Sequence, residues 1–198
     1  MEKGRLEAFS DGVIAIIITI MVLEIKVPHG DDLAALRPLL PVFLSYILSF
    51  LYVGIYWNNH HHLLKAADRI NGRIMWANLH LLFWLSLVPF VTGWLGENHV
   101  AAMPAAFYSL VLLLAAIAYY LLQLAIIAEH GRGSALARAL GRDFKGKLSP
   151  LFYIAAILLA ITGHPLIATI LNALVALIWL VPDRRIEKVL SGERKPNV

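Results

Sequence analysis

The chain has 198 residues, of which 60% are hydrophobic and only 15% are charged, and its mean hydropathy is +0.72. This composition excludes an ordinary soluble domain and indicates an all-α integral membrane protein in a lipid bilayer. The absence of cysteine excludes disulfide bonds and thiolate metal ligands, and we interpret the formal charge of +4 as a topology signal that predicts no nucleic-acid partner.

Uncharged stretches recur along the chain, and each crossing of a bilayer needs about 20 apolar residues. The last stretch, 148–182, would be about 52 Å long as one helix, and Gly163-His164-Pro165 divides it. We expect no other broken helix inside the membrane and no cleavage of the first helix as a signal peptide. The sequence predicts one six-helix transmembrane repeat over residues 1–198, with helices at approximately 5–27, 38–64, 72–96, 101–129, 148–162 and 166–183.

The first predicted helix is short for a crossing and carries charge at both ends. Only twelve uncharged residues separate Asp11 from Glu24. As a helix they span about 18 Å, against a hydrocarbon thickness of about 30 Å. We therefore expect other protein or water around this helix rather than lipid alone.

Apolar residues form a stripe along this helix at about 100° per residue. Gly12, Ile20 and Leu23 lie within about 40° of Ile16 around the helix, so these four residues share one face. Thr19 lies on the shoulder of the stripe, where its hydroxyl can meet a passing ion or a backbone carbonyl, and the backbone bond is the favoured interpretation.

The Asp11 carboxylate lies about 140° from Ile16 around the helix. If the stripe faces a central axis, this carboxylate points into its own bundle. Asp11 is therefore predicted to hold helices together rather than to filter ions.

Polar side chains of the first three predicted helices fall at one depth, near the end that carries the N-terminus. Buried polar groups in a membrane need hydrogen-bond partners, so we expect a clamp between the helices at this depth. The candidates are Ser10, Asp11, Trp57, Asn58, His61, His62, Asn78 and His80.

Three consecutive histidines, His60 to His62, raise the question of a metal or haem site. Consecutive side chains of a helix point about 100° apart, so a metal would need ligands from other helices. Networked or interfacial histidines are the favoured interpretation, and no metal or cofactor is expected. Haem held by His61 and His80 is an alternative that an absorption spectrum tests.

Basic residues are divided unevenly between the two sides that six helices define. Fifteen of the 17 lysines and arginines fall on one side, and only Lys26 and Arg37 fall on the other. The positive-inside rule then predicts a multi-pass protein of the cell membrane with both termini in the cytoplasm. The longest basic loop, 131–147, is either an interfacial amphipathic helix or a solvated linker.

Motifs of hydrolases, zinc proteases and phosphate-binding loops do not occur, and no T-V-G-Y-G potassium filter is present. We expect no enzyme, and any ion selectivity must come from other residues.

Three motifs resemble the transmembrane protein 175 family, which contains endosomal and lysosomal potassium channels and their prokaryotic homologues. The first is R-x-x-x-F-S-D, formed by Arg5, Phe9, Ser10 and Asp11 at the start of the first helix. The others are W-x-x-x-H at Trp57 and His61, and N-x-x-L-L-x-x-x-x-x-x-P from Asn78 to Pro89. The resemblance covers essentially the whole chain.

This resemblance implies that the first helix of each subunit lines a central pore with Ile16 at the constriction. Ile20 and Leu23 match further hydrophobic pore residues of prokaryotic members. Animal members resemble two fused repeats and this chain has one, so a homotetramer is implied. The permeant ion would be K⁺, with modest selectivity over other monovalent cations. A structural layer would hold the helices in register, made of Arg5, Phe9, Ser10, Asp11, Trp57, His61 and Asn78.

The residues themselves leave a second function open. In a proton-coupled secondary transporter, Asp11 and the histidines of the second and third helices would form a proton relay. Its flux would saturate and depend on a pH gradient.

Overall fold

The computed structural model describes residues 2–131, 137 and 144–180, and all regular structure in these residues is helical. The predicted all-α membrane class is confirmed. The α-helices are α1 Lys3–Met21, α2 Leu40–Lys65, α3 Gly72–Ser86, α4 Val88–Glu97, α5 Ala102–His130, α7 Phe144–Ile161 and α8 Pro165–Leu180. Two 3₁₀ helices, η1 Val22–Glu24 and η2 Leu33–Leu39, lie between α1 and α2.

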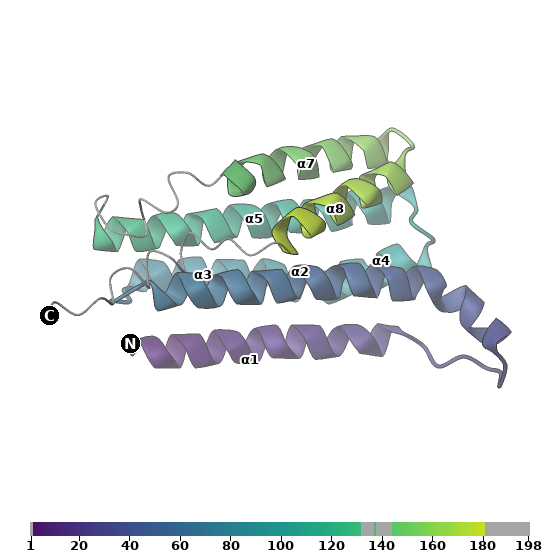
Figure 1. Ribbon diagram of the computed structural model, residues 1–198, viewed down its shortest axis with the longest axis horizontal. Helices are drawn as coiled ribbons and strands as arrows, with labels where there is room; N and C mark the ends of the chain where they lie inside the picture. The colour runs from purple at the N-terminus through teal and green to yellow at the C-terminus, as the bar shows by residue number, and fades with distance from the viewer. Residues whose placement is uncertain (1, 132–136, 138–143, 181–198) are drawn as a thin grey trace, which may run out of the picture.

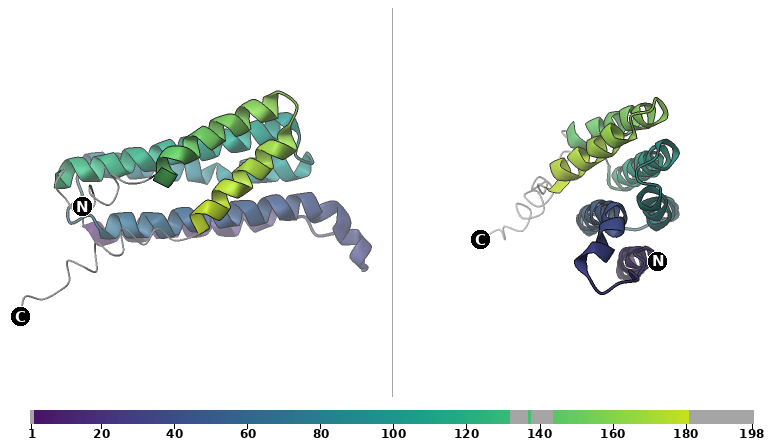
Figure 2. Two further views of the ribbon diagram at one scale, coloured as in Figure 1. Left: turned by 45° about the horizontal axis from the view of Figure 1, so that its top comes forward. Right: turned by 90° about the vertical axis from the view of Figure 1, so that its right-hand side faces the viewer.

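The helices run side by side along the long axis of the molecule (Figure 1). The end-on view in Figure 2 places α1 at one edge of the bundle and α7 and α8 at the other. Helix α1 packs on α2, α3 and α4, while α5 packs on α3, α4, α7 and α8. The position of α1 at an edge leaves one of its faces outside the bundle.

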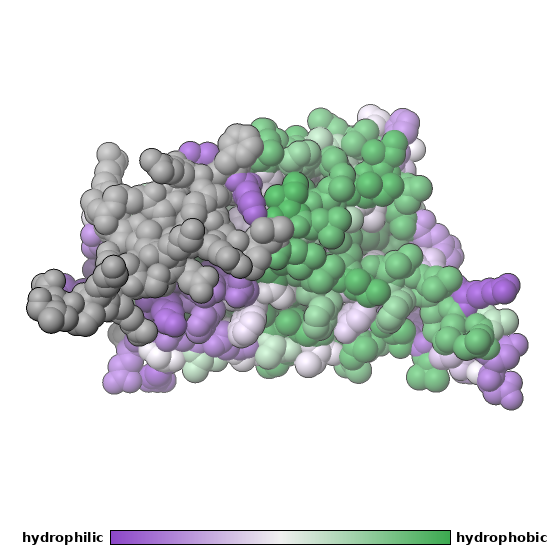
Figure 3. Space-filling view, in the orientation of Figure 1, coloured by the Kyte–Doolittle hydropathy of each residue, from purple (hydrophilic) through white to green (hydrophobic). Residues whose placement is uncertain are grey.

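Four helical stretches in the described part of the chain are long and apolar enough to cross a membrane, and Pro165–Leu180 is a shorter apolar helix. On the face shown in Figure 3, hydrophobic residues gather over the middle of the molecule and hydrophilic residues lie toward its right-hand end. The chain is a multi-pass membrane protein. The four stretches are Lys3–Glu24, Leu33–Lys65, Gly72–Glu97 and Ala102–His130.

The first helix ends earlier than the predicted boundary at residue 27. Its α-helical part ends at Met21, and η1 adds one tighter turn to Glu24. Ile25 is already extended, with φ −84° and ψ 99°. Two residues further on, Val27 precedes Pro28, and a residue before proline is pushed away from the α conformation.

The predicted helix 72–96 corresponds to one apolar helical stretch, Gly72–Glu97, which is interrupted at Leu87 between α3 and α4. Pro89 has no N–H to donate to the carbonyl four residues earlier, and its ring crowds that carbonyl. At the break the Leu87 N–H donates to the Trp84 carbonyl at 3.3 Å, and Ser86 Oγ donates to the Phe83 carbonyl at 2.7 Å. The break lies inside the stretch Gly72–Glu97 that is long enough to cross the membrane.

The division between α7 and α8 lies at Gly163-His164-Pro165. Gly163 has a φ of +93°, a conformation that glycine adopts without strain. The His164 N–H donates to the Leu159 carbonyl at 2.8 Å and closes the end of α7, and Pro165 begins α8. Most of the predicted loop 131–147 and the predicted helix end at 181–183 lie outside the described residues.

Candidate functional site

The outer face of α1 and η1 is apolar and exposed in the single chain. Ile16, Ile20 and Leu23 are 57%, 42% and 76% exposed, and Gly12 and Thr19 are exposed beside them. The angles between these residues on an α-helix, at about 100° per residue, predicted that they share one face. A continuous apolar surface of this kind needs lipid, another subunit or a narrow pore against it.

Thr19 satisfies its hydroxyl within its own helix. Its Oγ1 donates to the carbonyls of Ala15 at 3.1 Å and Ile16 at 3.0 Å. This is the backbone interpretation favoured by the sequence. The hydroxyl nevertheless lies on the exposed side of α1.

The opposite face of α1 is buried in the bundle. Its buried residues recur at intervals of three or four, which is the period of one helix face. They are Leu6, Ser10, Ile14, Ile17 and Met21. The exposed stripe is therefore held by a packed inner face.

A buried chain of hydrogen bonds joins α1, α2 and α3. Ser10 Oγ donates to the Leu6 carbonyl at 2.8 Å and accepts from Asn78 Nδ2 at 2.9 Å. Asn78 Oδ1 lies 2.6 Å from His60 Nε2, so this ring nitrogen carries the proton. Ser10, Asn78 and His60 are all buried. Because each polar group has one fitting partner, the chain of bonds fixes the relative position of three helices.

His60 takes the place in this network that the sequence had predicted for His61. His61 is exposed, and its ring lies 6.4 Å from the ring of Trp57 on the same face of α2. The two residues of the W-x-x-x-H motif lie one helical turn apart on the same face of α2. In this structure that face is exposed. A usable signal was the spacing of His60 from Val53 and Leu64, seven and four residues away and buried.

A second bond ties α1 to α2 near the same depth. Trp57 Nε1 donates to Asp11 Oδ1 at 3.0 Å, and Asp11 is half-buried. The carboxylate thus points to its own bundle, away from the Ile16 stripe. Trp57 was predicted only to pack beside the network, but it donates a hydrogen bond.

Arg5 and Phe9 do not join the network within one chain. Both are exposed, and among the described residues the Arg5 side chain makes no hydrogen bond or ion pair. Contacts inside one chain therefore do not explain why Arg5 and Phe9 belong to the first-helix motif.

The predicted histidines point in different directions. His60 faces the core, whereas His61 is exposed and His62 half-buried. His80 is exposed and accepts a hydrogen bond from Trp84 Nε1 at 2.9 Å. In the part of the chain that the structure describes, no three His, Asp or Glu side chains are grouped as metal ligands.

A groove of about 680 Å³ lies beside the stripe, between α1 and α4. Gly93 lines it, and a Cβ at this position would lie 2.9 Å from Glu24 Oε2, so glycine admits the carboxylate. At the same end Lys26 Nζ donates to Glu97 Oε1 at 2.6 Å. The side chains along the groove include Ile16, Ile20, Glu24, Phe90, Trp94 and Glu97.

Comparison with known proteins shows which family has a sequence similar to this chain. The profile of the family described as endosomal/lysosomal potassium channel TMEM175 matches residues 5–89. A potassium channel of Chryseobacterium sp. (strain P1-3) is 57% identical over 191 residues, which are 96% of this chain and 99% of the relative. The chain belongs to the TMEM175 family. The resemblance predicted from the first-helix motif is confirmed.

Two further matches agree with this assignment. A potassium channel of Streptomyces collinus (strain DSM 40733 / Tue 365) is 40% identical over 126 residues, covering 60% of this chain and 61% of the relative. The crystal structure of a lysosomal potassium-selective channel TMEM175 homolog from Chamaesiphon minutus matches with a TM-score of 0.80 and 29% identity, over 92% of this chain and 98% of that chain. The profile match at residues 5–89 contains both faces of α1, the buried network and Pro89.

Proposed function

We propose that this chain is the subunit of a passive potassium channel in which α1 of each copy lines the pore. The observation that carries the proposal is the exposed apolar stripe of Ile16, Ile20 and Leu23 at the edge of the bundle. Support comes from the relatives of Chryseobacterium and Streptomyces, which are named potassium channels.

The proposed assembly is a homotetramer. One chain contributes a single α1, which cannot enclose a pore, and the sequence resembles one of the two repeats in animal members. The groove beside Ile16 and Ile20 gives a neighbouring subunit an apolar surface to pack on. Such packing would replace lipid contacts of α1 with close van der Waals contacts between subunits, which favours association in a bilayer.

The proposed selectivity arises from a hydrophobic collar at Ile16. A narrow apolar collar excludes water when closed and forces ions to shed part of their hydration shell when open. K⁺ holds its water less tightly than Na⁺ and loses less in the collar. The preference for K⁺ is therefore modest, and other monovalent cations pass at lower rates.

In the proposed orientation both termini face the cytoplasm, in the cell membrane. Helices α7 and α8 make the fifth and sixth crossings. Lys65 ends α2 beside the start of α1, where Lys3 Nζ donates to its carbonyl at 3.0 Å, and Arg69 and Arg73 follow within the next eight residues. Lys26 follows η1 at the other end of α1 and pairs with Glu97. This distribution supports the orientation through the positive-inside rule.

The collar is tested by cation flux in liposomes under K⁺ and Na⁺ gradients. We expect Ile16→Asn to lower the K⁺ to Na⁺ flux ratio, because an amide at the constriction replaces part of the lost hydration. The matched control is Ile154→Asn, which changes an exposed isoleucine of α7. A wild-type ratio in Ile16→Asn would contradict the collar.

The same liposomes separate a channel from a proton-coupled carrier that uses Asp11. Passive conduction continues without a pH gradient and rises with K⁺ concentration without early saturation. Flux that saturates and stops when the pH gradient is removed would overturn the proposed mechanism.

A further inference from the structure

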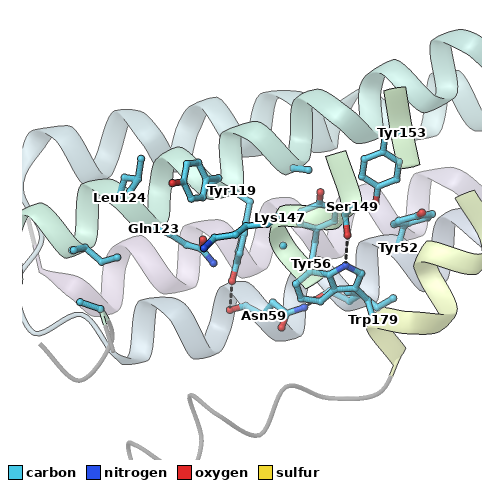
Figure 4. Close-up of a pocket in the computed structure, with 16 residues that line it drawn as sticks. Tyr52, Tyr56, Asn59, Tyr119, Gln123, Leu124, Lys147, Ser149, Tyr153 and Trp179 are labelled. Carbon is cyan, nitrogen blue, oxygen red and sulfur yellow. Dashed lines mark hydrogen bonds between the residues drawn. The ribbon is translucent and has the colours of Figure 1, made fainter. Parts of the chain in front are cut away.

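A second cavity is lined by residues of α2, α5, α7 and α8 and shares none of them with the groove beside the stripe (Figure 4). Its volume is about 360 Å³. Binding sites for small ligands usually measure about 300–1,000 Å³, so this cavity has room for a headgroup but not for a whole lipid. The proposed ion pathway along α1 does not use it.

Gln123 is a buried polar side chain in the wall of this cavity. It is 6% exposed, and among the described residues its amide has no hydrogen-bond partner. Among the described residues, Asn172 Oδ1 is the buried side-chain atom without a partner, so the Gln123 amide still reaches the cavity space. Its donor and acceptor atoms are therefore open to a ligand or water there.

Lys147 of α7 provides a positive charge in the same cavity. Figure 4 shows its side chain extending along the cavity toward Gln123. Within the described part of the chain it forms no ion pair, because the two ion pairs found there involve Lys3 and Lys26. An ammonium and an amide that converge in one space form a site for an anionic oxygen.

Three other polar groups in the wall are already bonded to protein. The Tyr119 hydroxyl donates to the Asn59 carbonyl at 3.1 Å, and Trp179 Nε1 donates to Ser149 Oγ at 2.8 Å. The Tyr52 hydroxyl donates to the Asn172 carbonyl at 2.6 Å. These bonds hold the wall and do not involve Gln123 or Lys147.

The cavity opens to the apolar outer surface of α5. Tyr120 and Leu124 line it and are 52% and 42% exposed. Its α2 wall includes Asn59, six residues or about 9 Å before Lys65 at the basic end of that helix. Lys147 is an exposed residue that lines this cavity. An exposed positive charge, an apolar exit and a depth near the basic end match a lipid at the membrane interface.

We propose that this cavity binds the headgroup of an anionic glycerophospholipid. Its phosphate lies between Lys147 and Gln123, and its acyl chains leave past Tyr120 and Leu124. Free phosphate offers the same oxygen chemistry without the chains. The proposal depends on the chain being a membrane protein and is independent of whether it conducts K⁺, so the flux experiments and the binding experiment can fail separately.

The test uses the purified full chain in detergent and measures its thermal unfolding midpoint with three probes. These are short-chain phosphatidylglycerol, phosphatidylcholine of the same chain length, and inorganic phosphate. We expect only phosphatidylglycerol to raise the midpoint. Lys147→Gln should weaken its apparent affinity about tenfold, the effect of losing one charged hydrogen bond. The matched control Lys65→Gln removes an exposed lysine at the same end of the bundle and should keep the full response.

Three results would overturn the proposal. Equal shifts with phosphatidylcholine would indicate a site for any amphiphile, and equal shifts with inorganic phosphate would indicate a free-anion site. An unchanged affinity in Lys147→Gln would remove the ammonium from the site. If that variant does not fold, Gln123→Met keeps the volume and removes the amide, and an unchanged phosphatidylglycerol response there would equally contradict the proposal.

Discussion

The two faces of α1 use opposite kinds of interaction. Toward the bundle, Ser10 is buried and bonded through Asn78 to His60. Outward, Ile16 and Ile20 are apolar and exposed. Hydrogen bonds are directional and allow one arrangement, whereas apolar contact is non-directional. The polar face therefore determines where the helix lies, and it leaves the apolar face for the proposed pore.

The largest effect is expected from removing the centre of the polar face. Asn78→Leu leaves His60 Nε2 without its acceptor and Ser10 Oγ without its donor, both buried. Unpaired buried polar groups reduce stability by about 1–3 kcal/mol each, so the free energy of unfolding should fall by about 2–6 kcal/mol. The loss of stability is measured as a lower thermal unfolding midpoint, monitored by fluorescence-detected size-exclusion chromatography. A wild-type midpoint would show that the network does not position α1.

The histidine pair sharpens the same comparison. His60→Ala should lower the free energy of unfolding by about 2–3 kcal/mol, because it opens a cavity and frees Asn78 Oδ1. His61→Ala, one residue along but exposed, should change it by less than about 0.5 kcal/mol. Equal effects in the two variants would contradict the assignment of His60 to the network.

A smaller effect is expected at the edge between the two faces. Asp11→Ala removes the acceptor of Trp57 Nε1, which lies where water can replace it, so a loss of about 1 kcal/mol is expected. The change should appear in folded or assembled yield by size-exclusion chromatography, with the K⁺ to Na⁺ flux ratio preserved. Normal assembly with an altered ratio would make Asp11 part of the selectivity mechanism.

The smallest effect is expected at the exposed pair of Lys26 and Glu97. The hydrogen bond to Glu97 and the attraction of its charge raise the pKa of Lys26 above its ordinary value of 10.5. The stability from the pair is therefore present below pH 10.5 and is lost as the pH rises through the raised pKa. Lys26→Met should unfold at a slightly lower temperature than wild type at pH 8, and the difference should shrink in more alkaline buffer. A difference that grows with pH would contradict the sign of this linkage.

Helical geometry was sufficient to predict the exposed stripe, because the angles between Ile16, Ile20 and Leu23 depend only on local helix structure. For His60 over His61 it offered only a partial signal, the spacing of His60 from Val53 and Leu64, because the choice also depends on where Asn78 of another helix lies. Pro89 was visible in the sequence, but a proline can begin, bend or end a helix, and packing decides which. Lys147 and Gln123 line the same cavity, but they belong to two different helices. No pattern within either helix could have predicted that they lie together.

The most direct test of the central claim places one thiol on the exposed face of α1. The chain has no cysteine, so Ile16→Cys creates a unique reactive site in liposomes that carry a K⁺ gradient. A charged methanethiosulfonate should react at this position and block K⁺ flux, whereas Ile154→Cys on α7 should conduct normally after the same treatment. Undiminished K⁺ flux through Ile16→Cys, with complete modification verified by mass, would contradict a pore lined by α1.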